Sequence, residues 1–458
     1  MAAAELSRSL KPRHLTMISI GGIIGAGLFV GSSASIAAVG PAIVVSYLIT
    51  GTLVLLVMRM LGEMAMSLPG VHSFTDFPRA GLGHWAGFVT GWLYWYFWMI
   101  VVPVEAIAGA NILHTWINLP AGLLGCILMA AMTAVNLMSA RSYGEFEFWF
   151  SSIKVSAIIA FIAIGAAYAF GWTSPHGATF ANLTSHGGFM PHGAVAVLAG
   201  AVTVYFQLTG AEIITVAAVE SAEPARAVAQ LTSSIIVRIL TFYVGSIFFI
   251  VSIVPWDRIV VGESPFTRAL LHMHFAWAGA AMDIIILTAV LSCLNSAFYV
   301  CSRVLFVLAE HGDAPKALIQ LNRRKVPVKS VLLCALAGVV GILAAVAAPQ
   351  RVFAFLVDAA GALMVFNYMI VAIAQVRLRR ERERTGAPAP ALTMWLFPWA
   401  SYAAIAGMAA VLIAMAFTPA LAHELHVSLV AIAVALIAYF VLRSRRRRSM
   451  TAAGASAD

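Results

Sequence analysis

Apolar runs of about 20 residues recur along most of this 458-residue chain, separated by short polar connections. A bilayer core about 30 Å thick needs roughly that many residues for each helical crossing. Hydrophobic residues make up 62% of the chain and charged residues 10%, outside the range of a water-soluble domain. The runs also lack the ten-residue alternating pattern of a membrane barrel. The sequence therefore predicts an all-α membrane protein.

Twelve apolar runs, bounded by charged residues, prolines or polar loops, each predict one spanning helix. The expected spans are 16–38, 42–66, 86–112, 119–139, 149–171, 193–218, 235–255, 276–308, 328–348, 353–376, 395–417 and 427–443. An even number of spans places both termini on one side. The longest polar connections, at about 309–327 and 377–394, are too short for a soluble domain.

Basic residues are distributed unevenly across this topology. Of the 28 Lys and Arg, 24 fall on the side of the termini, so the positive-inside rule places both termini in the cytoplasm, at 1–15 and 444–458. The net charge of +9 therefore reflects topology and does not indicate nucleic-acid binding. The five arginines within 443–448 suit contact with anionic lipid, although a stop-transfer flank is the simpler interpretation. No sequence feature specifies an oligomeric state.

Two spans are interrupted near their middle by small or polar residues. They are the first, ISIGGIIGAGLFVG, and the sixth, YFQLTGAEIITV. Interruptions at corresponding places in two five-span halves indicate an inverted-repeat transporter that binds substrate where the helices unwind. Glycines also allow close helix packing, but Gly21, Gly22, Gly25 and Gly27 occupy several helical faces, which favours an opened backbone. The N–H groups exposed around Ala26 would then suit a carboxylate.

Motifs spread from residue 10 to about 399 resemble the amino acid permeases of the amino acid–polyamine–organocation superfamily, specifically its bacterial amino acid transporter branch. The 4-aminobutyrate (GABA) permeases are the group that they match best. The matching stretches are LKPRHLTMISIGGIIGAGLFVGSS, VMRMLGEMA, GWLYWYFW, YGEFEFWFSSIKV, GGFMPHG, GAEIITVAAVESAEP, SCLNSAFYVCSRVLFVLAEHGDAP and MWLFPW.

This resemblance implies a five-plus-five inverted repeat with broken first and sixth spans, followed by two additional helices. The transport core would be 16–376, with repeats at about 16–171 and 193–376, and the additional helices would lie in 395–443. It also implies a bacterial inner-membrane location and import by proton symport with alternating access. The substrate would be a small zwitterionic amino acid, with 4-aminobutyrate or a related ω-amino acid favoured.

The resemblance also assigns binding roles to the two broken spans. Substrate carboxylate would bind backbone amides of Gly25, Ala26 and Gly27, and the amine and the gate would involve Phe206, Gln207, Leu208 and Thr209, with Phe206 as an aromatic gate. The family's GABA permeases read closer to IGAS-L and FSFMGAEI, whereas this chain has IGAGLF and FQLTGAEI. Gln207 in place of serine and Leu208 in place of an aromatic residue reshape the expected pocket floor. The alternative substrates are therefore proline, an aromatic or cationic amino acid, or a polyamine.

Lys154 is an ionisable residue within the fifth span, where charge is costly. The resemblance places such a lysine inward, where sodium-coupled relatives hold an ion between spans one and eight. A fixed ammonium there would repel sodium, so we predict that the coupling ion is H⁺, with no cofactor. The predicted start of this span at 149 leaves about five residues to its inner end, so snorkelling of Lys154 to the surface is the alternative.

Four further residues are candidates at membrane depth. Glu212 follows the break in the sixth span. The resemblance implies that it is a coupling or gating carboxylate, and the alternative is that it caps the opened helix by a hydrogen bond. Glu105, about one turn from the outer end of span three, and Trp95, in an aromatic-rich stretch typical of interfacial belts, are possible pocket residues. Glu63 lies near the inner end of span two, where we predict a pair with a cytoplasmic arginine.

Rival functions lack their sequence signatures. The chain has no G-x-x-x-x-G-K-[ST], no G-x-S-x-G and no metal-ligand pair on a helix face, so no catalytic or metal-binding residue is expected, and neither an enzyme nor an ATP-driven pump is favoured. Filter loops of a channel are also absent, and paired broken spans have no evident use in a membrane receptor. The sequence therefore favours a secondary transporter.

Overall fold

The computed structural model describes residues 10–68, 73–218, 223–347, 360 and 362–455. Its elements are α-helices joined by short connections and 3₁₀ or π-helical turns. In chain order they are α1 (Pro12–Gly21), η1 (Gly27–Gly31), α2 (Ser32–Val39), α3 (Ile43–Ser67), α4 (Asp76–Leu82), α5 (His84–Trp116), α6 (Ala121–Met138), α7 (Ala140–Ala169), η2 (Phe180–Leu183), α8 (Gly193–Leu208), α9 (Ile213–Ala218), α10 (Pro224–Ile253), η3 (Trp256–Arg258), α11 (Pro265–His272), α12 (Ala278–Glu310), η4 (Lys316–Ile319), α13 (Val328–Ala347), α15 (Leu363–Arg384), α16 (Trp399–Ala416) and α17 (Pro419–Ala455).

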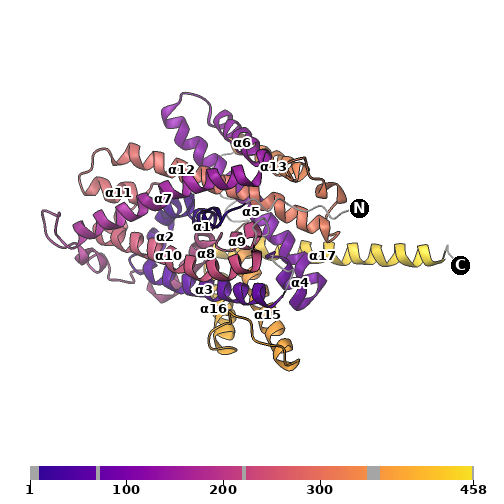
Figure 1. Ribbon diagram of the computed structural model, residues 1–458. Helices are drawn as coiled ribbons and strands as arrows, with labels where there is room; N and C mark the ends of the chain where they lie inside the picture. Colours follow the sequence, from indigo (N-terminus) through magenta and orange to yellow (C-terminus); the bar gives the residue numbers. More distant parts are fainter. Residues whose placement is uncertain (1–9, 69–72, 219–222, 348–359, 361, 456–458) are drawn as a thin grey trace.

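The predicted fold class is confirmed. Nine helices of the described chain are long and apolar enough to cross a membrane, and η1–α2 and the Leu240–Ile253 part of α10 are shorter apolar helices. The predicted tenth span falls partly on α15. The first span is divided into α1 and η1–α2, and the sixth into α8 and α9, as the sequence predicts. Together these elements form one bundle, from which the C-terminal end of α17 projects (Figure 1).

Several helix ends differ from their predicted positions because apolar runs mark hydrocarbon depth rather than helix length. The fifth span begins at Ala140, not 149, because the side chain of Ser139 accepts a hydrogen bond from the Ser142 N–H and starts the helix early. The seventh begins at Pro224, not 235, and α17 runs through Ala455 into the predicted tail. Most of 353–361, the predicted start of span ten, lies outside the described residues.

The broken spans lie inside the bundle, and long helices surround them. α1 packs against α7 and α10, α8 packs against α3, and α12 packs along both α5 and α7. Figure 1 shows α1, α8 and α9 near the middle of the bundle, with α6 and α13 on one side and α16 on another. The middle of the fold is therefore the region where the two interruptions meet.

Buried charges occur at several places in this bundle. Glu105, Glu147, Lys154 and Glu212 are buried around the breaks and belong to the site described below. At another location, the buried carboxylate of Glu63 on α3 lies 3.0 Å from Arg382 Nη2 and 3.4 Å from Arg379 Nη1, both on α15. It also accepts hydrogen bonds from Gln375 and from the Met394 N–H. The prediction that Glu63 pairs with arginine is confirmed.

Candidate functional site

The two helix breaks cross in direct backbone contact. α1 ends at Gly21, and α8 ends at Leu208, after which Gly210 adopts φ +120°. A Cβ on Gly210 would lie 2.8 Å from the carbonyl oxygen of Gly22 and 3.2 Å from the Cα of Ile23. Only glycine tolerates both the positive φ and this approach. The crossing therefore depends on a residue without a side chain.

Tyr243 of α10 holds the crossing together. Its buried hydroxyl lies 3.0 Å from the carbonyl oxygen of Ile23 and 3.0 Å from that of Gln207. A phenol has one hydrogen, so Tyr243 donates to one of these opened carbonyls at a time. Because a buried carbonyl without a donor is costly, the hydroxyl stabilises whichever break receives its hydrogen, and its position within reach of both carbonyls links the two breaks.

A small cavity lies beside the crossing. Its volume is about 20 Å³, room for about one water molecule. The first break, α8, α5 and α12 all contribute to its wall, which comprises Gly22, Ile23, Gly25, Gly27, Phe97, Trp98, Val101, Glu105, Phe206, Gln207, Thr209 and Cys293. Aromatic rings and opened backbone thus meet in one small space, and an occupant larger than water requires the wall to move.

On one side of the crossing, Lys154 of α7 points into the first break. Its ammonium donates to the carbonyl oxygens of Gly21 and Ile24, the latter at 2.7 Å, and to Ser292 Oγ of α12 at 2.8 Å. An ammonium has three hydrogens, and all three have acceptors. Lys154 is fully buried, so these acceptors and the nearby carboxylates offset a desolvation cost of several kcal/mol.

Two buried carboxylates lie near Lys154. Glu147, two turns earlier on α7, accepts hydrogen bonds from Ser292 and from Ser151 at 2.9 Å. Glu105 lies within hydrogen-bonding reach of the Ala26 N–H and of the Cys293 thiol. Both interact electrostatically with Lys154, and in each carboxylate Oε2 has no hydrogen-bond partner among the described residues. We call Glu105, Glu147 and Lys154 the lysine triad; with all three groups ionised, its net charge is −1.

On the other side of the crossing, Glu212 is enclosed by hydroxyl and amide donors. Tyr94 of α5 donates to Oε1 at 3.1 Å, and Tyr368 of α15 donates to Oε2 at 2.6 Å. The N–H of Gly210 donates to Oε2 at 3.1 Å. Glu212 therefore connects the second break to α5 and α15, and each of its oxygens already accepts a hydrogen bond.

Comparison with known proteins identifies the family of this chain. The model of the amino acid permease family matches residues 14–451. The chain is 43% identical over 452 residues to the gamma-aminobutyric acid permease of Bacillus subtilis, covering 98% of this chain and 96% of that protein. It is 42% identical over 420 residues to the gamma-aminobutyric acid permease of Escherichia coli K12, covering 91% of this chain and 90% of that protein. Identity to the E. coli K12 aromatic amino acid transport protein AroP is 35% over 423 residues, covering 92% of each chain. The chain belongs to the amino acid permease family.

Most of the predicted binding residues of this permease meet at the cavity. Gly25, Gly27, Phe206, Gln207, Thr209 and Glu105 line its wall, and Ala26 adjoins it through its N–H near Glu105. Gln207 is held by hydrogen bonds with Tyr47 and, at 2.9 Å, with Ser35. The end of its side chain is therefore fixed between helices, while its Cα, Cβ and Cγ face Gly27.

Two of the proposed pocket residues lie elsewhere in the permease. Leu208 packs in the apolar core and is absent from the cavity wall. Trp95 lines a separate groove between α5 and α17, whereas Trp98, almost one turn further along α5, faces the cavity. Helical phase explains both differences, because a residue one position away on a helix points about 100° away.

The depths of two charged residues also differ from the sequence estimate. Because α7 begins at Ala140, Lys154 lies about midway along its helix, and its exposed fraction is 0%, so snorkelling to the surface is wrong. Glu105 lies well inside α5, which continues to Trp116, rather than one turn from the outer end. Both residues therefore face the protein interior near the midpoint of their helices.

Several residues of the site were not predicted from the sequence, among them Glu147, Tyr243 and Ser292. A usable signal existed for Glu147, because it shares one helical face with Ser151 and Lys154 at spacings of four and three. Tyr94 and Tyr368 gave no such signal, because a tyrosine in an apolar span is equally suited to core packing. Their roles depend on tertiary contacts with Glu212.

Proposed function

We propose that this permease imports 4-aminobutyrate or a related ω-amino acid by proton symport. The crossing of the two breaks beside a small cavity is the observation that carries the proposal, since opened helices expose amides and carbonyls to a zwitterion. The names of two relatives that are 42% and 43% identical favour 4-aminobutyrate. An aromatic amino acid is the second candidate, favoured by Phe97, Trp98 and Phe206 in the wall and by the AroP relative.

The polarity of the two breaks orients the substrate. Its carboxylate binds the amides of Gly25, Ala26 and Gly27, at the start of the outer half of the first span. Its ammonium faces the opened carbonyls between Phe206 and Thr209, at the end of α8, where the helix dipole is negative. The cavity of about 20 Å³ must enlarge for this, so Phe206, whose ring lies 5.9 Å from that of Phe97, moves as a gate.

Proton coupling follows from the charge of the lysine triad. A zwitterion adds no net charge, so the triad stays at −1 unless a proton enters with the substrate. Burial penalises net charge strongly, and one bound proton makes the triad neutral. Glu105 sharpens this requirement, because its carboxylate lies near the Ala26 amide that receives the substrate carboxylate. Two anions there repel each other unless Glu105 is protonated or withdrawn.

Glu212 serves as a gate component in this scheme rather than as the coupled proton's carrier. Its carboxylate joins the second break to α5 and α15 through Tyr94 and Tyr368. Separation of these helices on the side that we propose to be cytoplasmic would break both contacts and open the site. Both termini and the arginine-rich end of α17 lie on that same side in the proposed topology.

Uptake of labelled 4-aminobutyrate by proteoliposomes tests the substrate. We expect saturable uptake and counterflow, with β-alanine and other ω-amino acids competing better than proline or phenylalanine. If phenylalanine competes better, the aromatic candidate replaces the first. Binding without flux would instead contradict transport and indicate a receptor. Polyamine competition equal to that of 4-aminobutyrate would contradict the zwitterion assignment.

A further inference from the structure

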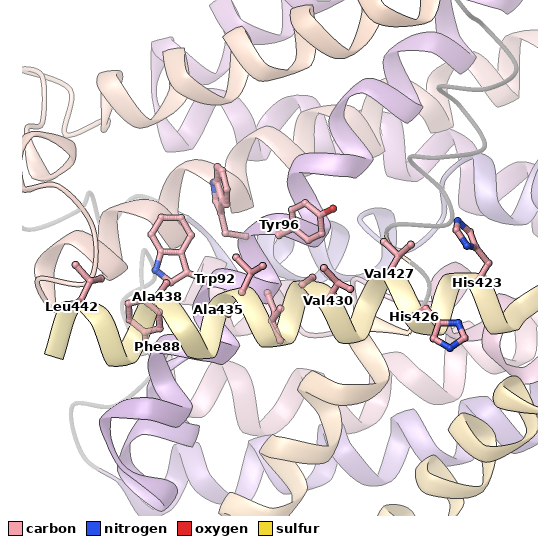
Figure 2. Close-up of a pocket in the computed structure, with 14 residues that line it drawn as sticks. Phe88, Trp92, Tyr96, His423, His426, Val427, Val430, Ala435, Ala438 and Leu442 are labelled. Atoms are coloured by element: carbon pink, nitrogen blue, oxygen red, sulfur yellow. The ribbon is translucent and has the colours of Figure 1, made fainter. Parts of the chain in front are cut away.

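An apolar groove runs between α5 and α17 on the side of α5 away from the substrate cavity. Its volume is about 820 Å³. Figure 2 shows its lining side chains along α17, from His423 and His426 at one end to Leu442 at the other. That stretch is about 28 Å of helix at 1.5 Å per residue, close to the thickness of a bilayer core of roughly 30 Å. The groove therefore follows the hydrocarbon region.

The walls of the groove suit an alkyl chain. Phe88 and Trp92 of α5 form an aromatic floor with ring centroids 6.3 Å apart, and small residues of α17, Ala435 and Ala438, leave the space above it. Val434 lines the groove and is still 59% exposed, so the space is open to the surroundings of α17. An acyl chain from the bilayer can enter from the side without any movement of the helices.

The C-terminal end of the groove is cationic. Arg443 directly follows Leu442, and its guanidinium lies 6.0 Å from the ring of Tyr439 and 3.4 Å from its hydroxyl. In the described part of the chain Arg443 forms no ion pair. Arg443 begins the run of five arginines in 443–448. A guanidinium at the membrane boundary is suited to a phosphate group.

We propose that this groove binds one anionic phospholipid, with its phosphate at Arg443 and an acyl chain along Phe88, Trp92 and Ala438. Charge favours this occupant over a second copy of the chain, because two parallel copies joined at the groove would bring two runs of five arginines together. The neutral lipid phosphatidylcholine offers the same chains but no net negative charge.

The bound lipid acts on transport through α5. This helix presents Trp92 to the groove, and Trp98 and Glu105 to the substrate cavity. A chain packed against Trp92 stabilises the position of α5 relative to α17, and with it the cavity wall. The site is independent of which amino acid the permease carries.

Native mass spectrometry of the full chain tests the proposal, after purification from vesicles containing equal phosphatidylglycerol and phosphatidylcholine. We expect one retained phosphatidylglycerol per monomer. Val434→Trp should fill the groove from its rim and weaken retention by about tenfold, the equivalent of losing about two buried methylene groups. Arg443→Gln should remove the preference for phosphatidylglycerol over phosphatidylcholine.

Leu429→Trp is the matched control, because it adds an indole to a 44%-exposed position of α17 outside the groove lining. It should retain lipid like the unmodified protein. Equal retention in the Val434 and Leu429 variants would overturn the site, and equal retention of the two lipids by the unmodified protein would overturn the anionic headgroup. If the unmodified protein and Leu429→Trp are dimers and Val434→Trp is a monomer, the groove binds a second copy of the chain instead.

Discussion

The two sides of the helix crossing hold buried charge in different ways. On one side, Lys154 lies with two carboxylates, each of which has an oxygen without a hydrogen-bond partner among the described residues. On the other side, Glu212 is a single ionisable carboxylate whose two oxygens are occupied by Tyr94, Tyr368 and the Gly210 N–H. A group of interacting ionisable residues can gain or lose one proton as a unit, whereas an isolated, fully bonded carboxylate mainly fixes the helices that it joins.

Lys154→Ala should have the largest effect. It removes the ammonium that donates hydrogen bonds to the Gly21 and Ile24 carbonyls, and it leaves Glu147 without a neighbouring cation. Breaking a buried pair in this way costs about 3–5 kcal/mol. We expect proton-driven uptake to fall to background and the melting temperature to decrease. Full proton-driven activity in this variant would show that Lys154 is not required for coupling and would leave Glu212 as the candidate.

Substitution of Gly25 or Gly27 by alanine should affect substrate binding to different extents. A Cβ on Gly25 would lie 3.0 Å from Cys293 Sγ and Glu105 Oε1, whereas one on Gly27 would lie 3.3 Å from Gln207 Cγ, its nearest neighbour. Overpacking costs about 1–3 kcal/mol, so Gly25→Ala should weaken substrate binding by about 100-fold and Gly27→Ala by less than about tenfold. Equilibrium binding measures both, and valine at either position should abolish binding. Near-normal affinity in both valine variants would contradict the assignment.

Glu147→Gln and Glu212→Gln form a matched pair across the crossing. Glutamine at 147 makes the ionised triad neutral without an added proton, so counterflow should persist while uptake no longer responds to a proton gradient. Glutamine at 212 can still accept from Tyr94 or Tyr368, so uptake should fall only several-fold and keep its gradient dependence. The reverse pattern would exchange the roles of the two sides.

Glu63→Gln should have the smallest effect on transport. Its carboxylate is 2% exposed and contacts two arginines of α15, remote from the crossing. We expect a loss of about 1–3 kcal/mol in stability, seen as a lower melting temperature, with proton dependence unchanged. Glu381→Gln on α15 is the control, because its exposed pair with Arg384 should contribute about 0–1 kcal/mol. Loss of gradient dependence in Glu63→Gln would extend the coupling machinery beyond the triad.

Long apolar runs and their interruptions made the fold and the two breaks predictable, because the bilayer fixes helix length and glycines mark opened backbone. The same patterns missed the early start of α7, since polar residues before 149 hid a helix capped by Ser139. They also misplaced Trp95 and Leu208, because helices that are apolar on every face have no hydrophobic phase. Tyr243 could not be identified, since its role is created by Ile23 and Gln207, which lie far from it in sequence.

Uptake by the unmodified permease in proteoliposomes, with proton and sodium gradients imposed separately, tests the central claim that the lysine triad couples protons to amino acid import. An inward proton gradient should drive accumulation of 4-aminobutyrate, and an inward sodium gradient alone should not, because the Lys154 ammonium fills the space between α1 and α12. Lys154→Ala in the same vesicles should lose the proton-driven component. Accumulation driven by sodium in the unmodified protein would contradict the account.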